Sequence, residues 1–141
     1  MIEIAIKGYI EKEIHELAGR LYPLHTTDLS KLNVVYTYTP ISGGHLSQTQ
    51  LELKVIDKDY DECKRVEKEL LALLDMEEDE SYVVTGGYKF HSELSGGGTL
   101  FNEGCQRYEN TLYFILKWRK TNVIWKEERK RNKRSCLYLQ W

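Results

Sequence analysis

A chain of 141 residues with 41% hydrophobic and 30% charged residues has the size and composition of one globular domain, which excludes a disordered or fibrous protein. No apolar run approaches the ~20 residues of a membrane-spanning helix, and acidic residues recur through the N-terminal stretch, so we expect a cytoplasmic protein without a signal peptide or membrane contact. The charge is unevenly divided, because residues 1–116 hold 11 Lys and Arg against 20 Asp and Glu, whereas residues 117–141 hold 9 against 2. This division predicts that the two parts meet different partners, or the same partner in neighbouring copies.

The first half of the chain predicts one helix and two strands. In residues 2–22, apolar side chains recur every three or four positions, which indicates an amphipathic helix that ends at Pro23. The β-branched and aromatic run 33–39 predicts a strand, and the alternation in 47–56 predicts a half-buried antiparallel strand. Residues 40–46 contain Pro and two adjacent Gly residues, which indicates a hairpin loop between these strands.

The second half predicts one more helix and two more strands. Asp59 followed by Glu62 resembles a capping box, and the apolar stripe that follows indicates an amphipathic helix. The acidic run 77–80 then predicts a solvated turn rather than a metal site. Residues 81–91 and 107–118 predict strands, and the second of these has bulky side chains on both faces, which is typical of a central strand.

Together these elements predict an α+β fold in the order α-β-β-α-β-β. We expect a mainly antiparallel four-stranded sheet with two helices packed on one face, plus a basic C-terminal arm. The domain should span residues 1–118 and the basic extension residues 119–141. The expected core consists of Ile6, Ile10, Ile14, Leu17, Leu51, Leu53, Val55, Val66, Leu70, Leu112, Phe114 and Leu116.

A search for chemistry-bearing motifs predicts no enzyme, no cofactor and no metal site. Three consecutive Gly residues at 96–98 lack the Lys and the following helix that a phosphate-binding loop needs. His91 and Cys105 flank the predicted loop 92–106 and could meet across the hairpin, but no known catalytic signature surrounds either residue. The four His residues have no partner at metal-ligand spacing, and the three Cys residues are widely separated, as structural thiols are.

The loop predicted at residues 92–106 is the strongest candidate for a contact surface. It is longer than most hairpin connections, and it carries apolar side chains that a solvated loop does not need. We therefore expect its Gly residues to act as hinges for contact with a partner; the alternative is an arm that folds back on its own sheet. The candidate interface residues are Ser95, Gly96, Gly97, Gly98, Leu100 and Phe101, with a second loop formed by Ile41, Gly43, Gly44 and His45.

The C-terminal arm is basic and then becomes apolar. Its basic side chains belong to Arg119, Lys120, Lys126, Arg129, Lys130, Arg131, Lys133 and Arg134. In the ending 135–141, Leu137, Leu139 and Trp141 alternate with Cys136, Tyr138 and Gln140, which is a strand periodicity with bulky groups on both faces. A short strand is unstable alone, so this one must pair with a sheet edge, either its own or that of a neighbouring copy.

Four stretches of the sequence resemble the tail terminator, or tail completion, proteins of tailed bacteriophages, which are also called minor capsid or tail-to-head joining proteins. These stretches read VVYTYTPISGG (34–44), DKDYDE (57–62), FHSELSGGGTLFNEGCQRYE (90–109) and YFILKWRK (113–120). The resemblance covers about residues 1–120 and implies an antiparallel sheet with helices on one side and no covalent chemistry. It also implies a homo-hexameric ring that caps the tail tube, ends tube growth and presents a face to the head-tail connector, within a virion assembled in the host cytoplasm. The basic extension 119–141 has no counterpart in this resemblance.

A nucleic-acid-binding module is the alternative function. Trp residues mixed with Lys and Arg in 118–134 are the combination that stacks on bases and neutralises phosphates. The acidic body would repel a nucleic-acid backbone, which argues against a free DNA-binding protein. In a ring, however, a basic segment could line a bore through which DNA passes.

Overall fold

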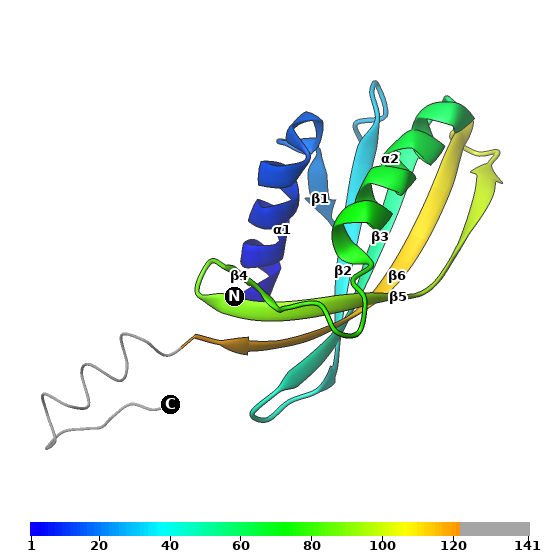
Figure 1. Ribbon diagram of the computed structural model, residues 1–141. Helices are drawn as coiled ribbons and strands as arrows, with labels where there is room; N and C mark the ends of the chain where they lie inside the picture. Colours follow the sequence, from blue (N-terminus) through cyan, green and yellow to red (C-terminus); the bar gives the residue numbers. More distant parts are fainter. Residues whose placement is uncertain (122–141) are drawn as a thin grey trace, which may run out of the picture.

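The computed structural model describes residues 1–121 (Figure 1). The basic residues 126–134 and the predicted strand 135–141 therefore lie outside the described residues. The elements follow in the order α1 (Ile2–Glu13), η1 (His15–Leu17), β1 (Leu21–Pro23), β2 (Asn33–Ser42), β3 (Ser47–Asp57), α2 (Tyr60–Leu74), β4 (Val83–Thr85), β5 (Tyr88–Asn102) and β6 (Arg107–Lys120).

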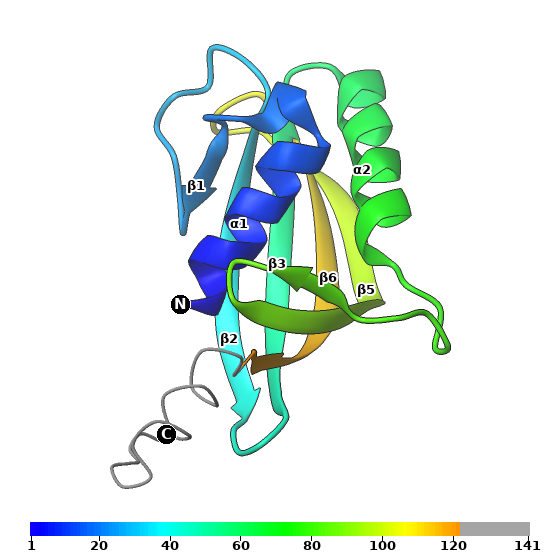
Figure 2. The same cartoon turned by 60° about the vertical axis from the view of Figure 1, so that its left-hand side comes forward.

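The sheet has six strands in the order β1-β2-β3-β6-β5-β4 and curls into a half-barrel (Figures 1 and 2). β1 pairs with β2 in parallel, and every other neighbouring pair is antiparallel. The predicted four-stranded sheet in a strict α-β-β-α-β-β order is therefore wrong. The two additional strands, β1 and β4, have three residues each, which is too short for an alternating pattern to reveal. The prediction that the strand at 107–118 is central is confirmed, since β6 lies between β3 and β5.

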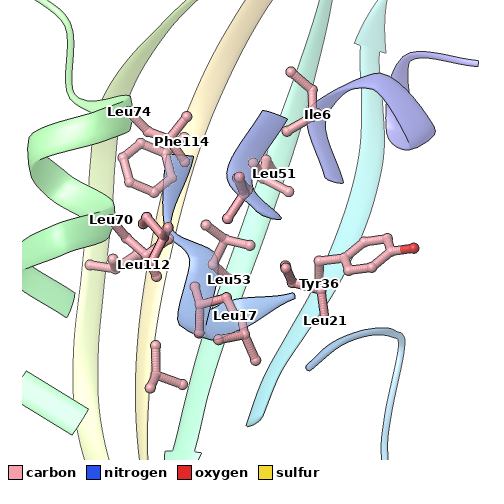
Figure 3. Packing of buried hydrophobic residues seen from close by; sticks show 14 of the residues in the cluster. Ile6, Leu17, Leu21, Tyr36, Leu51, Leu53, Leu70, Leu74, Leu112 and Phe114 are labelled. Carbon is pink, nitrogen blue, oxygen red and sulfur yellow. The ribbon is translucent and has the colours of Figure 1, made fainter. Parts of the chain in front are cut away.

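Both helices cover the concave face of the sheet, and the core lies between them and the strands (Figure 2). All twelve residues of the predicted core are buried. Figure 3 shows Leu70 and Leu74 of α2 beside Phe114 of β6, with Leu51 and Leu53 of β3 further along the same layer. The alternation of the long strands and the stripe of α2 were sufficient to assign these residues to one interior.

The first helix is shorter than predicted. α1 ends at Glu13, the backbone leaves the helical conformation at Ile14, and the chain continues as a single 3-10 turn before it enters β1. Ile14, Leu17 and Leu21 are nonetheless buried. The apolar spacing therefore predicted correctly which of these residues are buried. It did not predict the end of the helix, which the chain leaves so that Leu21 can join the sheet beside Val34.

The second helix begins as the sequence predicts. Asp59 is its N-cap, and the Asp59 carboxylate accepts a hydrogen bond of 2.9 Å from the backbone N–H of Asp61. The second half of a capping box is missing, because Glu62 pairs with Arg65 instead. The Arg65 guanidinium also forms two hydrogen bonds of 2.8 Å to Glu16, so that the end of the first helical segment is tied to α2.

The predicted loop 92–106 is also wrong, because most of it is strand. β5 continues to Asn102, and residues Gly96–Asn102 pair in antiparallel register with Tyr113–Arg107 of β6. The tight turn instead precedes β5, where Gly86 and Gly87 both have positive φ, as a two-residue hairpin turn requires. Residues 40–46 do connect β2 and β3 as a hairpin, as predicted.

Candidate functional site

The outer edge of β5 changes character halfway along the strand. Its first residues pair with β4, with Val83 opposite Phe90. Further along, the Ser92 carbonyl accepts a hydrogen bond from the Met76 N–H, and the Leu94 N–H donates to the Asp75 carboxylate at 3.1 Å. From Ser95 to Asn102, β5 has β6 on one side and no strand on the other within residues 1–121. We call residues 95–102 the open edge.

The alternation of an antiparallel ladder shows which backbone groups the open edge presents. Ser92 and Leu94 direct their polar groups away from β6, so Glu93 forms the hydrogen-bonded pair with Ile115. The odd-numbered residues of β6 therefore bond to β5, and beyond the bulge between Leu94 and Gly96 their partners are Gly96, Gly98, Leu100 and Asn102. The N–H and C=O groups of Gly97, Thr99 and Phe101 consequently point outward, and they form a template for another strand.

The side chains of the open edge do not protect it from pairing. Natural edge strands are protected by charges, Pro residues or short length, whereas residues 95–102 carry no charge and no Pro. Leu100 and Phe101 are 55% and 42% exposed. An uncharged edge of this length with apolar side chains is therefore open to pairing with another strand.

Gly97 has a packing role rather than the hinge role that we predicted. A Cβ added there would lie 2.5 Å from the Thr111 carbonyl oxygen and 3.4 Å from the Leu112 side chain, so only Gly allows β5 to approach β6 this closely. A Cβ at Gly98 would meet nothing within 4 Å, and one at Gly96 would only touch Tyr113. The face of the sheet on which Gly96 and Gly98 would carry side chains is therefore uncrowded at this segment.

An aromatic row continues from the open edge to the start of α2. Phe101 contacts Tyr108 edge-to-face at 4.9 Å between ring centroids, and Tyr108 contacts Tyr60 in the same way at 5.4 Å. Tyr60 is 43% exposed, similar to Phe101. A strand paired with the open edge would cover Phe101 and extend the apolar contact toward this row.

Acidic side chains border the other end of the open edge. The segment 75–80, which we call the acidic loop, contains five carboxylates, and all five residues are exposed. Three contacts hold the loop beside β5. The Met76 N–H and the Asp75 carboxylate bond to Ser92 and Leu94, as described above. In addition, the Glu77 carbonyl lies 2.8 Å from Nε2 of the buried His91. A partner that follows the outer side of β5 therefore passes five negative charges before it reaches the open edge.

A second open edge lies on the opposite side of the sheet and is better protected. β1 covers β2 only at Val34–Tyr36, which leaves residues 37–42 without a neighbour on that side within the described chain. Pro40 and a register shift between Pro40 and Ser42 interrupt this edge. Both features are devices that disfavour pairing. A cavity of about 480 Å³ between Ile2 and Ile41 lies beside it.

The remaining predicted interface residues lie at the other end of the molecule. Ile41, Gly43, Gly44 and His45 belong to the β2–β3 hairpin, and Arg119 and Lys120 to the end of β6. His45 and Arg119 line a cavity of about 600 Å³ together with Leu46, Tyr82, Val84 and others. The structure therefore does not bring the two predicted loop regions together. Apart from Ile41, the edge of β2 was not predicted as part of a site, and neither was the acidic loop. The run of carboxylates was visible in the sequence, but its place beside β5 was not.

The residues considered for catalysis are also separated. His91 lies in the first half of β5, whereas Cys105 lies in the turn beyond Asn102, so the two residues do not meet across the hairpin. Burial raises the pKa of the Cys63 thiol to about 11, which keeps this core residue protonated. Within residues 1–121, no three His, Cys, Asp or Glu side chains are grouped so that they could hold a metal ion, and no helix has the length and apolar character to cross a membrane.

Comparison with known proteins gave no relative: the sequence matches no protein family and no curated protein.

Proposed function

We propose that this protein is a tail terminator of a tailed bacteriophage, a structural virion protein that forms a hexameric ring on the end of the tail tube. The ring stops tube growth and joins the tail to the head-tail connector. The proposal rests on the resemblance to that family of residues 34–44, 57–62, 90–109 and 113–120. The structural feature that supports it is the open edge of β5.

The open edge supports assembly because it is a long, uncharged template for strand pairing. Main-chain hydrogen bonds to Gly97, Thr99 and Phe101 would supply affinity, and the side chains of Leu100 and Phe101 would supply apolar contact. A surface of this kind favours a protein that functions in contact with others over one that functions alone.

The arrangement also supports a closed ring. Copies that join through two different surfaces form rings when the rotation between them closes, whereas copies that join through one self-complementary surface form dimers. The edges of β5 and β2 lie on opposite sides of the sheet, and they differ because β2 carries Pro40 whereas residues 95–102 contain no Pro. The subunit therefore has the unlike sides that a cyclic assembly requires.

The first test is the oligomeric state and its effect on tube growth. The full chain would be measured by mass photometry and negative-stain imaging, with a six-fold ring as the expected result. Tail-tube protein encoded beside this gene would then be polymerised with and without the full chain. Added protein should cap the tubes and shorten them, whereas tubes of unchanged length would contradict the proposal.

Two further observations test the proposal: the neighbouring genes, and the binding of DNA that the alternative function requires. Genes for head-connector and tail-tube proteins should flank the gene for this chain. Binding of the full chain to a 30-base-pair DNA duplex would be measured at low and high salt. Tight, salt-dependent binding by a monomer that caps no tubes would favour a nucleic-acid-binding module instead.

A further inference from the structure

We propose that the open edge of β5 is the docking site for the C-terminal segment 135–141 of a second copy of this chain, and that the basic residues 126–134 lie against the acidic loop. This inference rests on the proposed function, because it identifies the contact between neighbouring subunits of the ring.

The length and pattern of the segment match the open edge. Residues 135–141 are as many as residues 96–102, and Leu137, Leu139 and Trp141 alternate with Cys136, Tyr138 and Gln140. A strand added to a sheet edge places alternate side chains on the two faces, so one set can contact the concave side near Phe101 and the other the side of Leu100.

The charges fix the direction of the added strand. Residues 122–141 carry six Lys and Arg residues against two Glu residues, and all six precede the apolar ending. Along β5 the acidic loop likewise precedes the open edge, because it lies beside Ser92 and Leu94. The basic part meets the acidic part only if the segment runs parallel to β5. Parallel docking is therefore part of the proposal.

The linker is long enough to reach an open edge of β5. The last described residue, Thr121, donates a hydrogen bond of 2.9 Å to the Gly87 carbonyl, so the chain leaves the fold beside the start of β5. Residues 122–134 span up to about 45 Å when extended. The path along β5 from Gly87 to Gly96 is about 30 Å long, so the linker exceeds the length of the strand that it has to follow, and the cross-linking experiment below decides which copy supplies the segment.

The other occupants within a homo-oligomer fit less well. The edge of β2 carries Pro40 and an irregular register, so it offers a neighbour a poor strand. Two open edges of β5 could pair with each other, but this contact is self-complementary and would close a dimer rather than a ring. Docking of the C-terminal segment on the open edge instead joins two different surfaces, as a ring requires.

The main experiment compares the oligomer of the full chain with that of two variants. In the first, the chain ends at Arg134, which removes residues 135–141 and keeps every basic residue. In the second, Thr99→Pro removes an outward-pointing N–H from the open edge, and Thr99→Val is its matched control because it keeps that N–H. Circular dichroism and thermal melting would show whether each variant is folded.

Both disruptive variants should raise the apparent dissociation constant of the oligomer about 100-fold or more. The shortened chain loses every main-chain hydrogen bond of the added strand, whereas Thr99→Pro removes one donor and places the Pro ring where the added strand would lie. Thr99→Val should assemble as the full chain does. A synthetic peptide of residues 129–141, with Ser in place of Cys136, should bind the shortened chain, and a peptide with Ser at 137, 139 and 141 should not. Rings that form equally well from the shortened chain would overturn the inference and leave the proposed function standing.

Cross-linking identifies which copy supplies the segment. In a Cys105→Ser background, Thr99→Cys would be joined to Cys136 with a bis-maleimide, and Thr37→Cys on β2 would serve as the control. The expected product is a ladder of chains linked between subunits. Linkage within a single chain, or a full chain that stays monomeric at 100 µM, would overturn docking between copies. If the segment links subunits but the assembly does not cap tubes, the docking site stands and the tail-terminator function fails.

Discussion

Gly97→Ala and Gly98→Ala form a matched pair that tests whether residues 92–102 are a strand packed against β6. The two Gly residues are adjacent, exposed and identical in chemistry, so a flexible loop would treat both substitutions alike. In the strand, a Cβ at Gly97 would lie 2.5 Å from the Thr111 carbonyl oxygen, while a Cβ at Gly98 would meet nothing within 4 Å. We therefore expect the two substitutions to change the free energy of unfolding in opposite directions.

The magnitude follows from two terms. Replacing Gly by Ala restricts the unfolded chain, which favours folding by about 0.5–1 kcal/mol at both sites. At Gly97 the clash with the backbone of β6 costs about 1–3 kcal/mol, and β6 cannot easily retreat because β3 holds its other side. The free energy of unfolding should fall by about 1–2 kcal/mol for Gly97→Ala and rise by up to about 1 kcal/mol for Gly98→Ala.

Urea unfolding monitored by circular dichroism would measure both differences, and thermal melting should shift by about 3–5 °C per kcal/mol in a domain of this size. Each variant would be measured at two protein concentrations, because assembly also stabilises the folded state. Equal effects of the two substitutions on the free energy of unfolding would refute the close approach of β5 and β6, and they would indicate that residues 92–102 form a flexible loop.

Three further predictions concern the body of the fold. Leu70→Asp should unfold the chain, because Leu70 is fully buried and an unpaired buried charge costs several kcal/mol; a soluble variant that melts cooperatively would contradict this. Asp59→Ala should lower the free energy of unfolding by about 1 kcal/mol through loss of the cap of α2, measured by urea unfolding against Asp61→Ala. A variant that retains Cys63 as its sole Cys should resist a thiol reagent at pH 8. Since the folded pKa of Cys63 is raised to about 11, its contribution to stability should be lost as the pH rises from about 9 to 11, and Cys63→Ala should remove this dependence.

The parts of the fold that could be predicted are those where one physical pattern dominates. In β3, apolar residues alternate along the strand because one face meets the core and the other meets water. In α2, the same requirement produces a stripe with helical spacing. These patterns located the interior, including Ile14 and Leu17, even where the local structure was a 3-10 turn rather than the predicted helix.

The two glycine runs show why the rest could not be predicted. Gly86 and Gly87 form a tight turn that needs positive φ, whereas Gly97 lies in an extended strand and is needed for close approach to Thr111. Sequence alone does not separate these uses, because both are permitted only by the missing side chain. The open edge could not be predicted for a different reason. Whether a strand has one neighbour or two depends on the topology of the sheet, and here the topology depends on two strands of three residues each.

Hydrogen exchange can follow the open edge residue by residue, and it gives the most direct prediction about assembly. The N–H groups of Gly98 and Leu100 bond to β6, so they should exchange slowly both in dissociated and in assembled protein. Those of Gly97, Thr99 and Phe101 point outward, so they should exchange quickly in dissociated protein. If a strand from a neighbouring copy covers this edge, these three amides should become protected on assembly, which mass spectrometry with residue-level fragmentation would detect. Unchanged exchange at all three positions in an assembled ring would show that the open edge is not a subunit contact, because no strand can pair there without bonding to those groups.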